Sequence, residues 1–173
     1  MQTIFIALAA LLRLIPHLPN FTPIGAMALF GAAHGSRRFA IFAPLAALVA
    51  SDLILGAHPT LPYVYGAFIL VALVGMVIFR HGVATRRVIG ASLVSSAIFF
   101  LVTNFGVWAV RDFYPHTLQG LLTCYAVALP FLRNTVAGDL FYVGVLFGGY
   151  AVVRRMMRSP TPQLAPSRTQ DVS

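Results

Sequence analysis

The chain has 173 residues, of which 59% are hydrophobic and only 9% are charged, and its formal net charge is +8. Soluble domains carry roughly 25% charged residues, so this composition excludes a water-exposed surface. The sequence contains no lysine and no glutamate, and its arginines stand singly or in pairs between apolar segments. That spacing is typical of membrane flanks and excludes a nucleic-acid-binding face. The composition therefore predicts an integral membrane protein.

Apolar segments follow one another along the chain, and a helix needs roughly 20 such residues to cross hydrocarbon about 30 Å thick. In chain order the segments are Thr3–Ile15, Ile24–Ala33, Phe39–Ala57, Leu61–Phe79, Val88–Val110, Gly120–Leu132 and Val136–Val153. We expect an all-α polytopic bundle of about six transmembrane helices, with Gly120–Leu132 as a short outer-leaflet or re-entrant helix. If the first two segments form a re-entrant hairpin instead, four helices cross.

The arginines set the expected orientation. Nine of them follow or precede the predicted helices on one side: Arg37, Arg38, Arg80, Arg86, Arg87, Arg154, Arg155, Arg158 and Arg168. The positive-inside rule places this side in the cytoplasm, so residues 16–23, 57–62 and 111–135 lie outside and both termini lie inside. We expect a bacterial cytoplasmic membrane protein with a transmembrane domain over residues 1–156. Residues 157–173, rich in proline and polar residues, predict a disordered cytoplasmic tail.

Polar side chains within the apolar segments are candidates for function, because they are costly at membrane depth. Asp52 and Asn104 fall in the outer half of their helices, and Asp139 lies one turn inside the outer end of the last helix. Each also has a structural interpretation, such as pairing of Asp139 with Arg133 or a helix–helix hydrogen bond from Asn104. As a set on one side, they predict a cavity open to the outside. Its expected lining is Asn20, Asp52, Asn104, Trp108, Arg111, Tyr114, Asn134 and Asp139.

The chemistry expected in that cavity follows from these residue types. Arg111 supplies a guanidinium for an anionic group, and Trp108 supplies a stacking surface. Asp52 or Asp139 then supplies a counter-charge. The outer histidines His17, His58 and His116 come from three different loops without ligand spacing, so they are only weak candidates for a metal site and none is predicted.

Motifs for nucleotide, zinc or redox chemistry do not occur in the sequence, and nothing pairs a nucleophile with a base at recognisable spacing. The sequence therefore predicts neither an enzyme nor a cofactor. Small residues four apart, such as Gly144 and Gly148, permit close helix approach and indicate internal packing or a docked partner.

Several motifs occur in a characteristic order: Asn20 to Gly31 (NFTPIGAMALFG), Ser51-Asp52, Asn104 to Trp108 (NFGVW), Tyr114-Pro115 and Pro130-Phe131. Together they resemble a family of uncharacterised small bacterial membrane proteins, over about residues 3–153. More distantly, the layout is similar to the substrate-binding S components of energy-coupling-factor vitamin transporters. That resemblance implies six helices, cytoplasmic termini and a ligand pocket near the outer face. The alanine pair with which S components dock their coupling subunit has no counterpart in the first segment.

The favoured function is binding or uptake of a small organic, vitamin-like solute. Its expected partners are the lipid bilayer, the small-molecule ligand, and a membrane partner subunit or energising module. One alternative is a structural or assembly subunit of a larger membrane complex, in which side chains fill the outer pocket. The other is a small membrane enzyme that uses the outer histidine and aspartate groups.

Overall fold

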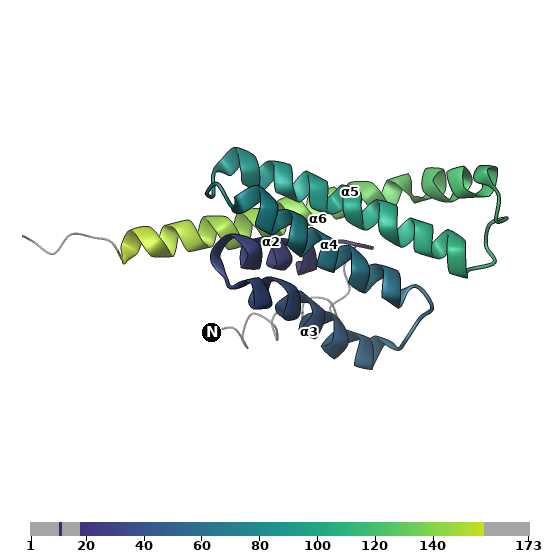
Figure 1. Cartoon of the computed structure of the whole chain (residues 1–173), viewed down its shortest axis with the longest axis horizontal. Helices are drawn as coiled ribbons and strands as arrows, with labels where there is room; N and C mark the ends of the chain where they lie inside the picture. The colour runs from purple at the N-terminus through teal and green to yellow at the C-terminus, as the bar shows by residue number, and fades with distance from the viewer. Residues whose placement is uncertain (1–10, 12–17, 158–173) are drawn as a thin grey trace, which may run out of the picture.

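The computed structural model describes Leu11 and residues 18–157 of the chain. These residues form five helices and no strand: α2 (Ile24–His34), α3 (Arg37–Leu55), α4 (Leu61–Phe79), α5 (Thr85–Val110) and α6 (Leu118–Met156). Figure 1 shows them packed side by side along one common direction. The helices α3 to α6 are long and apolar enough to cross a membrane. The all-helical, membrane-type fold is therefore confirmed, whereas the count of about six spans is not.

The middle helices begin and end close to the apolar segments that predict them. α4 has the same bounds as its apolar segment, and α5 ends at Val110 as expected. Two helices begin at side-chain caps, a common device for pairing free backbone N–H groups. Ser36 Oγ accepts a hydrogen bond from the Phe39 amide at the start of α3. Thr117 Oγ1 accepts one from the Gly120 amide at the start of α6.

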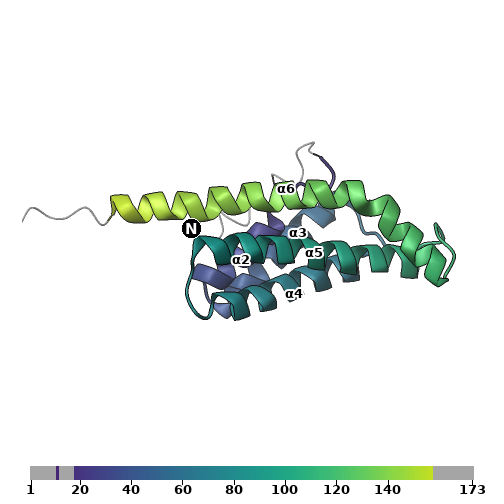
Figure 2. The same ribbon diagram turned by 90° about the horizontal axis from the view of Figure 1, so that it is seen from above.

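The last helix differs most from the prediction. α6 runs for 39 residues and joins the segments Gly120–Leu132 and Val136–Val153 into one element. The expectation of a separate short helix at Gly120–Leu132 is therefore wrong. Hydropathy falls at Arg133 and Asn134, but the helix continues because its backbone hydrogen bonds do not depend on side-chain polarity. Pro130 lies inside the helix, and Figure 2 shows that α6 bends in its first third.

The short helix α2 lies at the centre of the bundle. Its eleven residues span about 16 Å, too little to cross hydrocarbon about 30 Å thick. It contacts each of the other four helices, and seven of its residues are buried. α2 thus fits the re-entrant alternative with four crossings. The earlier segment Thr3–Ile15 lies, apart from Leu11, outside the described residues, as does the predicted tail beyond Met157.

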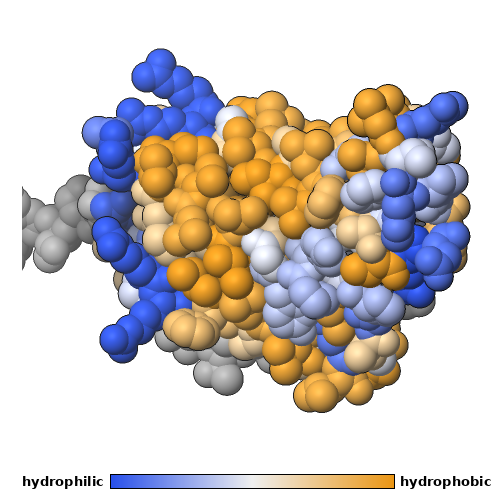
Figure 3. All heavy atoms as spheres, turned by 45° about the vertical axis from the view of Figure 1, so that its right-hand side comes forward, coloured by the Kyte–Doolittle hydropathy of each residue, from blue (hydrophilic) through white to orange (hydrophobic). Residues whose placement is uncertain are grey.

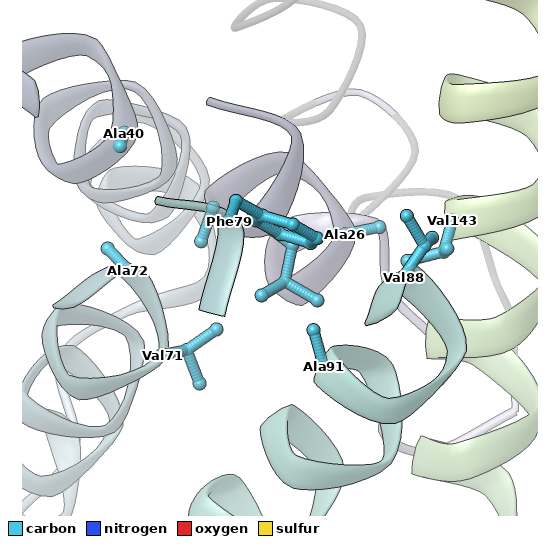
Figure 4. Close-up of a cluster of buried hydrophobic side chains, with 10 residues drawn as sticks. Ala26, Ala40, Val71, Ala72, Phe79, Val88, Ala91 and Val143 are labelled. Atoms are coloured by element: carbon cyan, nitrogen blue, oxygen red, sulfur yellow. The ribbon is translucent and has the colours of Figure 1, made fainter. Parts of the chain in front are cut away.

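The helices approach closely because small residues line their contacts. Ala26, Ala40, Ala72 and Ala91 come from four different helices and are almost fully buried in one cluster. Figure 4 labels these four alanines together with Val71, Phe79, Val88 and Val143 of the same cluster. At Gly31 an added Cβ would lie only 2.7 Å from Ala40 Cα, so α2 and α3 are in near-backbone contact. Such packing is typical of helices that associate within a bilayer.

The two ends of the bundle differ in charge. One end carries the end of α2, the start of α3, the α4–α5 turn and the end of α6 (Figure 1). This arginine-rich end contains Arg37, Arg38, Arg80, Arg86, Arg87, Arg154 and Arg155. The opposite end contains the connections at residues 56–60 and 111–117. Figure 3 shows hydrophilic side chains at both ends and a broad hydrophobic surface between them.

Candidate functional site

A cavity of about 440 Å³ lies within the opposite end of the bundle. This volume falls in the range of about 300–1,000 Å³ that small-molecule sites occupy. Its polar lining consists of Asn20, Thr22, His58, Thr60, Thr103, Asn104 and Tyr114. Its apolar lining consists of Pro19, Ile24, Leu48, Val64, Phe68, Phe99, Val107, Cys124, Val127, Ala128 and Phe131. Every described helix and both connections of that end therefore contribute a wall.

The segment before α2 closes one side of the cavity. It turns sharply, with the Phe21 amide donating to Leu18 O at 3.0 Å and Asn20 at a φ of 64°. Asparagine tolerates this left-handed conformation better than most residues. Gly138 on α6 permits the close approach of this segment, because a Cβ there would lie 3.0 Å from Phe21 Cα. Backbone packing thus holds Asn20 at the cavity.

The polar atoms of the other walls are held by local hydrogen bonds. Asn104 Nδ2 donates to Phe100 O at 2.8 Å, which fixes the amide on α5. Thr103 Oγ1 donates in the same way to Phe99 O at 2.7 Å. Across the cavity, His58 Nδ1 and Thr60 Oγ1 lie 2.8 Å apart. Hydroxyl, amide and imidazole groups donate and accept hydrogen bonds, so these walls can bind a polar ligand.

Three of the eight predicted lining residues, Asn20, Asn104 and Tyr114, line this cavity, together with the weak metal candidate His58. The other five predicted residues do not: Asp52, Trp108, Arg111, Asn134 and Asp139. Among the described residues that line it, none is an arginine or an aspartate. The charged contacts expected from Arg111, Asp52 and Asp139 are therefore absent from this cavity.

Trp108 and Arg111 belong to the connection between α5 and α6. Trp108 Nε1 donates to Pro115 O at 3.0 Å, and the His116 ring packs against the indole with centroids 5.4 Å apart. The Arg111 guanidinium lies 5.6 Å from the centre of the Phe113 ring. These contacts order the connection that carries Tyr114 to the cavity. Trp108 therefore supplies no stacking surface to this cavity, and Arg111 supplies no anion ligand to it.

Asp52 connects two helices. It is buried on α3 and accepts a hydrogen bond from the Tyr65 hydroxyl of α4 at 3.0 Å. Asn134 is half-buried on α6, outside the cavity lining.

Asp139 lies at the centre of the bundle rather than one turn inside its outer end. Because α6 begins at Leu118, Asp139 is in its middle, where the carboxylate accepts a hydrogen bond from Ser96 Oγ at 2.7 Å. A Cβ added to Gly25 would lie 2.5 Å from Asp139 Oδ1 and 2.9 Å from Ser95 Oγ. The carboxylate therefore sits against the first turn of α2, where the helix dipole favours negative charge. It connects α2, α5 and α6 and does not pair with Arg133.

The described histidines do not form a metal site. His58 lies at the cavity and His116 packs on Trp108, while His17 lies outside the described residues. Within the described part of the chain, no group of three or more histidine, cysteine or acidic side chains has the arrangement of metal ligands.

Sequence reasoning missed the threonines of the lining, Thr22, Thr60 and Thr103, as well as Cys124. Thr22 lies within the motif Asn20–Gly31 and Thr103 directly precedes the motif that begins at Asn104, which is the signal that points to them. The apolar wall residues carry no such signal, because lipid-facing and cavity-facing apolar side chains look alike in a sequence.

The fold and the cavity define a helical protein of membrane type with a mostly apolar cavity at one end. The chain belongs to the family of unknown function DUF6580, whose model matches residues 1–164. No curated protein and no solved structure matches it.

Proposed function

We propose that this protein binds a small, uncharged organic solute in the cavity at the opposite end of the bundle. The observation that carries the proposal is the hollow itself, about 440 Å³ in volume and lined by neutral polar groups above apolar walls. At about 30 Å³ for each water-sized group, it holds on the order of fifteen non-hydrogen atoms.

The composition of the lining selects the ligand class. The described part of the lining contains no arginine or aspartate, so an ionised ligand would lose its hydration there without gaining a counter-charge from these residues. Asn104, His58 and Tyr114 offer donors and acceptors for a neutral polar group, while Phe68, Phe99 and Phe131 surround an apolar or aromatic body. An uncharged, vitamin-like solute fits this arrangement better than the anionic ligand that Arg111 suggests.

A purely structural subunit is less well supported. In that role the pocket would be filled by side chains, since an empty cavity forfeits packing contacts. The segment before α2 and helix α5 also place the polar groups of Asn20 and Asn104 at the hollow, where a binding site uses them.

Membrane orientation and likeness to known transporters are parts of this proposal. The positive-inside rule places the arginine-rich end in the cytoplasm, so the cavity faces the outside. This is the layout expected from the distant resemblance to S components, with the protein as the substrate-binding part of an uptake system in a bacterial cytoplasmic membrane.

Native mass spectrometry of gently extracted protein tests the proposal. We expect an additional mass of a small neutral molecule on the wild type. Asn104→Leu should remove it, because the substitution keeps the side-chain volume but deletes the hydrogen-bonding amide. Asn134→Leu is the matched control, since it makes the same change outside the cavity and should retain the ligand.

Two outcomes would contradict the proposal. One is a bound mass that Asn104→Leu retains as fully as Asn134→Leu does. The other is a wild type free of small molecules that also shows no thermal stabilisation by a panel of neutral vitamins and nucleobases. A ligand at 100 times its Kd should stabilise the fold by about 2.7 kcal/mol.

A further inference from the structure

A second hollow lies at the arginine-rich end, between the start of α5 and the last turns of α6. This α5–α6 groove has a volume of about 650 Å³. Its walls are mostly apolar and include Val88, Ile89, Leu140, Val143 and Phe147. It shares no residue with the cavity of the proposed function.

Glycines keep this groove open. Gly144 and Gly148 line it one helical turn apart, and a Cβ added to either would meet no atom within 4 Å. The groove runs along α6 from Leu140 to Arg154, which is about 21 Å at 1.5 Å per residue. That length exceeds the half-thickness of the hydrocarbon core, about 15 Å. The groove is therefore long enough for a lipid acyl chain that spans one leaflet to lie along it.

The groove is apolar along its length and basic at its mouth. Arg154 and Arg155 line the mouth, and none of the described residues of the lining is acidic. The His34 ring forms the adjoining wall, with its centroid 4.2 Å from that of Tyr150. Burial and the nearby Arg154 guanidinium lower the pKa of His34. The positive charge of the mouth therefore comes from the two arginines.

We propose that the α5–α6 groove binds one anionic phospholipid, with an acyl chain along Gly144 and Gly148 and the phosphate at Arg154 and Arg155. Guanidinium groups bind phosphate oxygens through paired hydrogen bonds. Basic sites between transmembrane helices at the cytoplasmic side suit anionic headgroups. This site is independent of the solute proposed for the cavity.

Charge complementarity favours a lipid over a partner helix in this groove. An apolar helix would cover Arg154 and Arg155 without supplying a negative partner, and an unpaired arginine within a membrane is costly. A soluble phosphate would use the two arginines but leave the long apolar wall unused.

Native mass spectrometry with defined lipids tests this site. The full-length protein is exchanged into mild detergent with equal amounts of phosphatidylglycerol and phosphatidylcholine of identical acyl chains. We expect one retained phosphatidylglycerol per chain, favoured at least tenfold over phosphatidylcholine. The double variant Arg154→Gln/Arg155→Gln should lose this preference, because each arginine removed should lower the affinity for phosphatidylglycerol about fivefold. Arg37→Gln/Arg38→Gln, which removes the same charge outside the groove, should keep it.

A second pair of variants tests the groove itself. Gly148→Leu fills it and should lower lipid retention, whereas Gly149→Leu changes the neighbouring residue, which does not line it. The proposal is overturned if the Arg154/Arg155 variant keeps its preference or if Gly148→Leu and Gly149→Leu retain lipid equally. It is also overturned if inorganic phosphate displaces all bound lipid, or if a crosslinked second copy covers Gly148 in place of lipid.

Discussion

Gly25 and Asp139 meet at the centre of the bundle, although they come from its first and last described helices. The glycine leaves space for a carboxylate where any side chain would overlap Asp139 Oδ1 and Ser95 Oγ. In the sequence, Gly25 is one residue of an apolar motif and Asp139 is one polar residue in an apolar segment. Their contact could not be predicted from either alone, since it depends on how far α6 extends.

Gly25→Ala tests this contact. The added methyl group must displace Asp139 or Ser95, so we expect a loss of about 1–3 kcal/mol in the free energy of unfolding. Gly66→Ala is the control, because its Cβ would meet nothing within 4 Å and alanine gains up to about 1 kcal/mol in a helix. Unfolding titrations in mixed micelles measure both. Equal effects of the two substitutions would contradict the crowded packing at Gly25.

The hydrogen bond from Ser96 to Asp139 should be detectable as a coupling energy. Double-mutant cycles in membrane bundles average about 0.6 kcal/mol, with a maximum near 1.7. The bond from Ser96 to Asp139 is short and buried, so we expect about 1 kcal/mol of coupling between Ser96→Ala and Asp139→Ala. Additive effects of the two substitutions would show that the residues do not interact.

The position of polar residues in the sequence predicts some of the cavity lining correctly and includes other residues that do not line it. Asn20, Asn104 and Tyr114 line the hollow, but Trp108 and Arg111 hold the adjoining connection instead. Asn20 lies before α2, and the other four residues lie near the end of α5 or in the connection that follows it. All five are at the end of the bundle opposite the arginine-rich end. Which of them points inward depends on side-chain packing, which a sequence does not encode locally.

At the scale of elements, hydropathy predicts α4 and the end of α5 correctly, because a membrane-crossing helix must be apolar throughout its length. The same signal fails for α6, because the backbone hydrogen bonds of a helix do not depend on the polarity of its side chains. Arg133 and Asn134 therefore break the apolar pattern without breaking the helix.

The bend of α6 at Pro130 gives a prediction for that helix. Pro130→Ala restores a backbone donor and removes the ring clash, so α6 should straighten. Spin labels at the exposed positions 122 and 145, with buried Cys124 replaced by alanine, report the change. In a straight helix the Cα atoms of these positions lie about 35 Å apart. Leu129→Ala is the control, and an unchanged distance in Pro130→Ala would exclude a proline bend.

For the whole molecule, the gathering of arginines at one end predicts its orientation. Val83 lies exposed in the α4–α5 turn of that end, and Phe113 lies exposed in the α5–α6 connection. A membrane-impermeant maleimide on intact cells should label Phe113→Cys and leave Val83→Cys unlabelled, in a Cys124→Ala background. Permeabilised cells should show labelling of both. The reverse pattern on intact cells would place the cavity in the cytoplasm.

The cavity as a whole lies beyond what the sequence alone can show. Its walls come from five helices and two connections, and most of its lining is apolar. The sequence does predict that polar groups collect at one end, because three motif segments place them there. The volume that remains between those segments is a property of the packed bundle.

The central position of α2 sets an order for biogenesis. This helix leaves the ribosome before every other described helix, yet it is too short to insert alone, and its first turn needs Asp139 and Ser95 as neighbours. Its contacts with α3 and α4 can form as those helices are made, whereas its contacts with α6 form only after the final helix has been synthesised. A chain truncated before α6 should therefore be extracted and degraded by quality-control proteases, even though three complete spanning helices are already present.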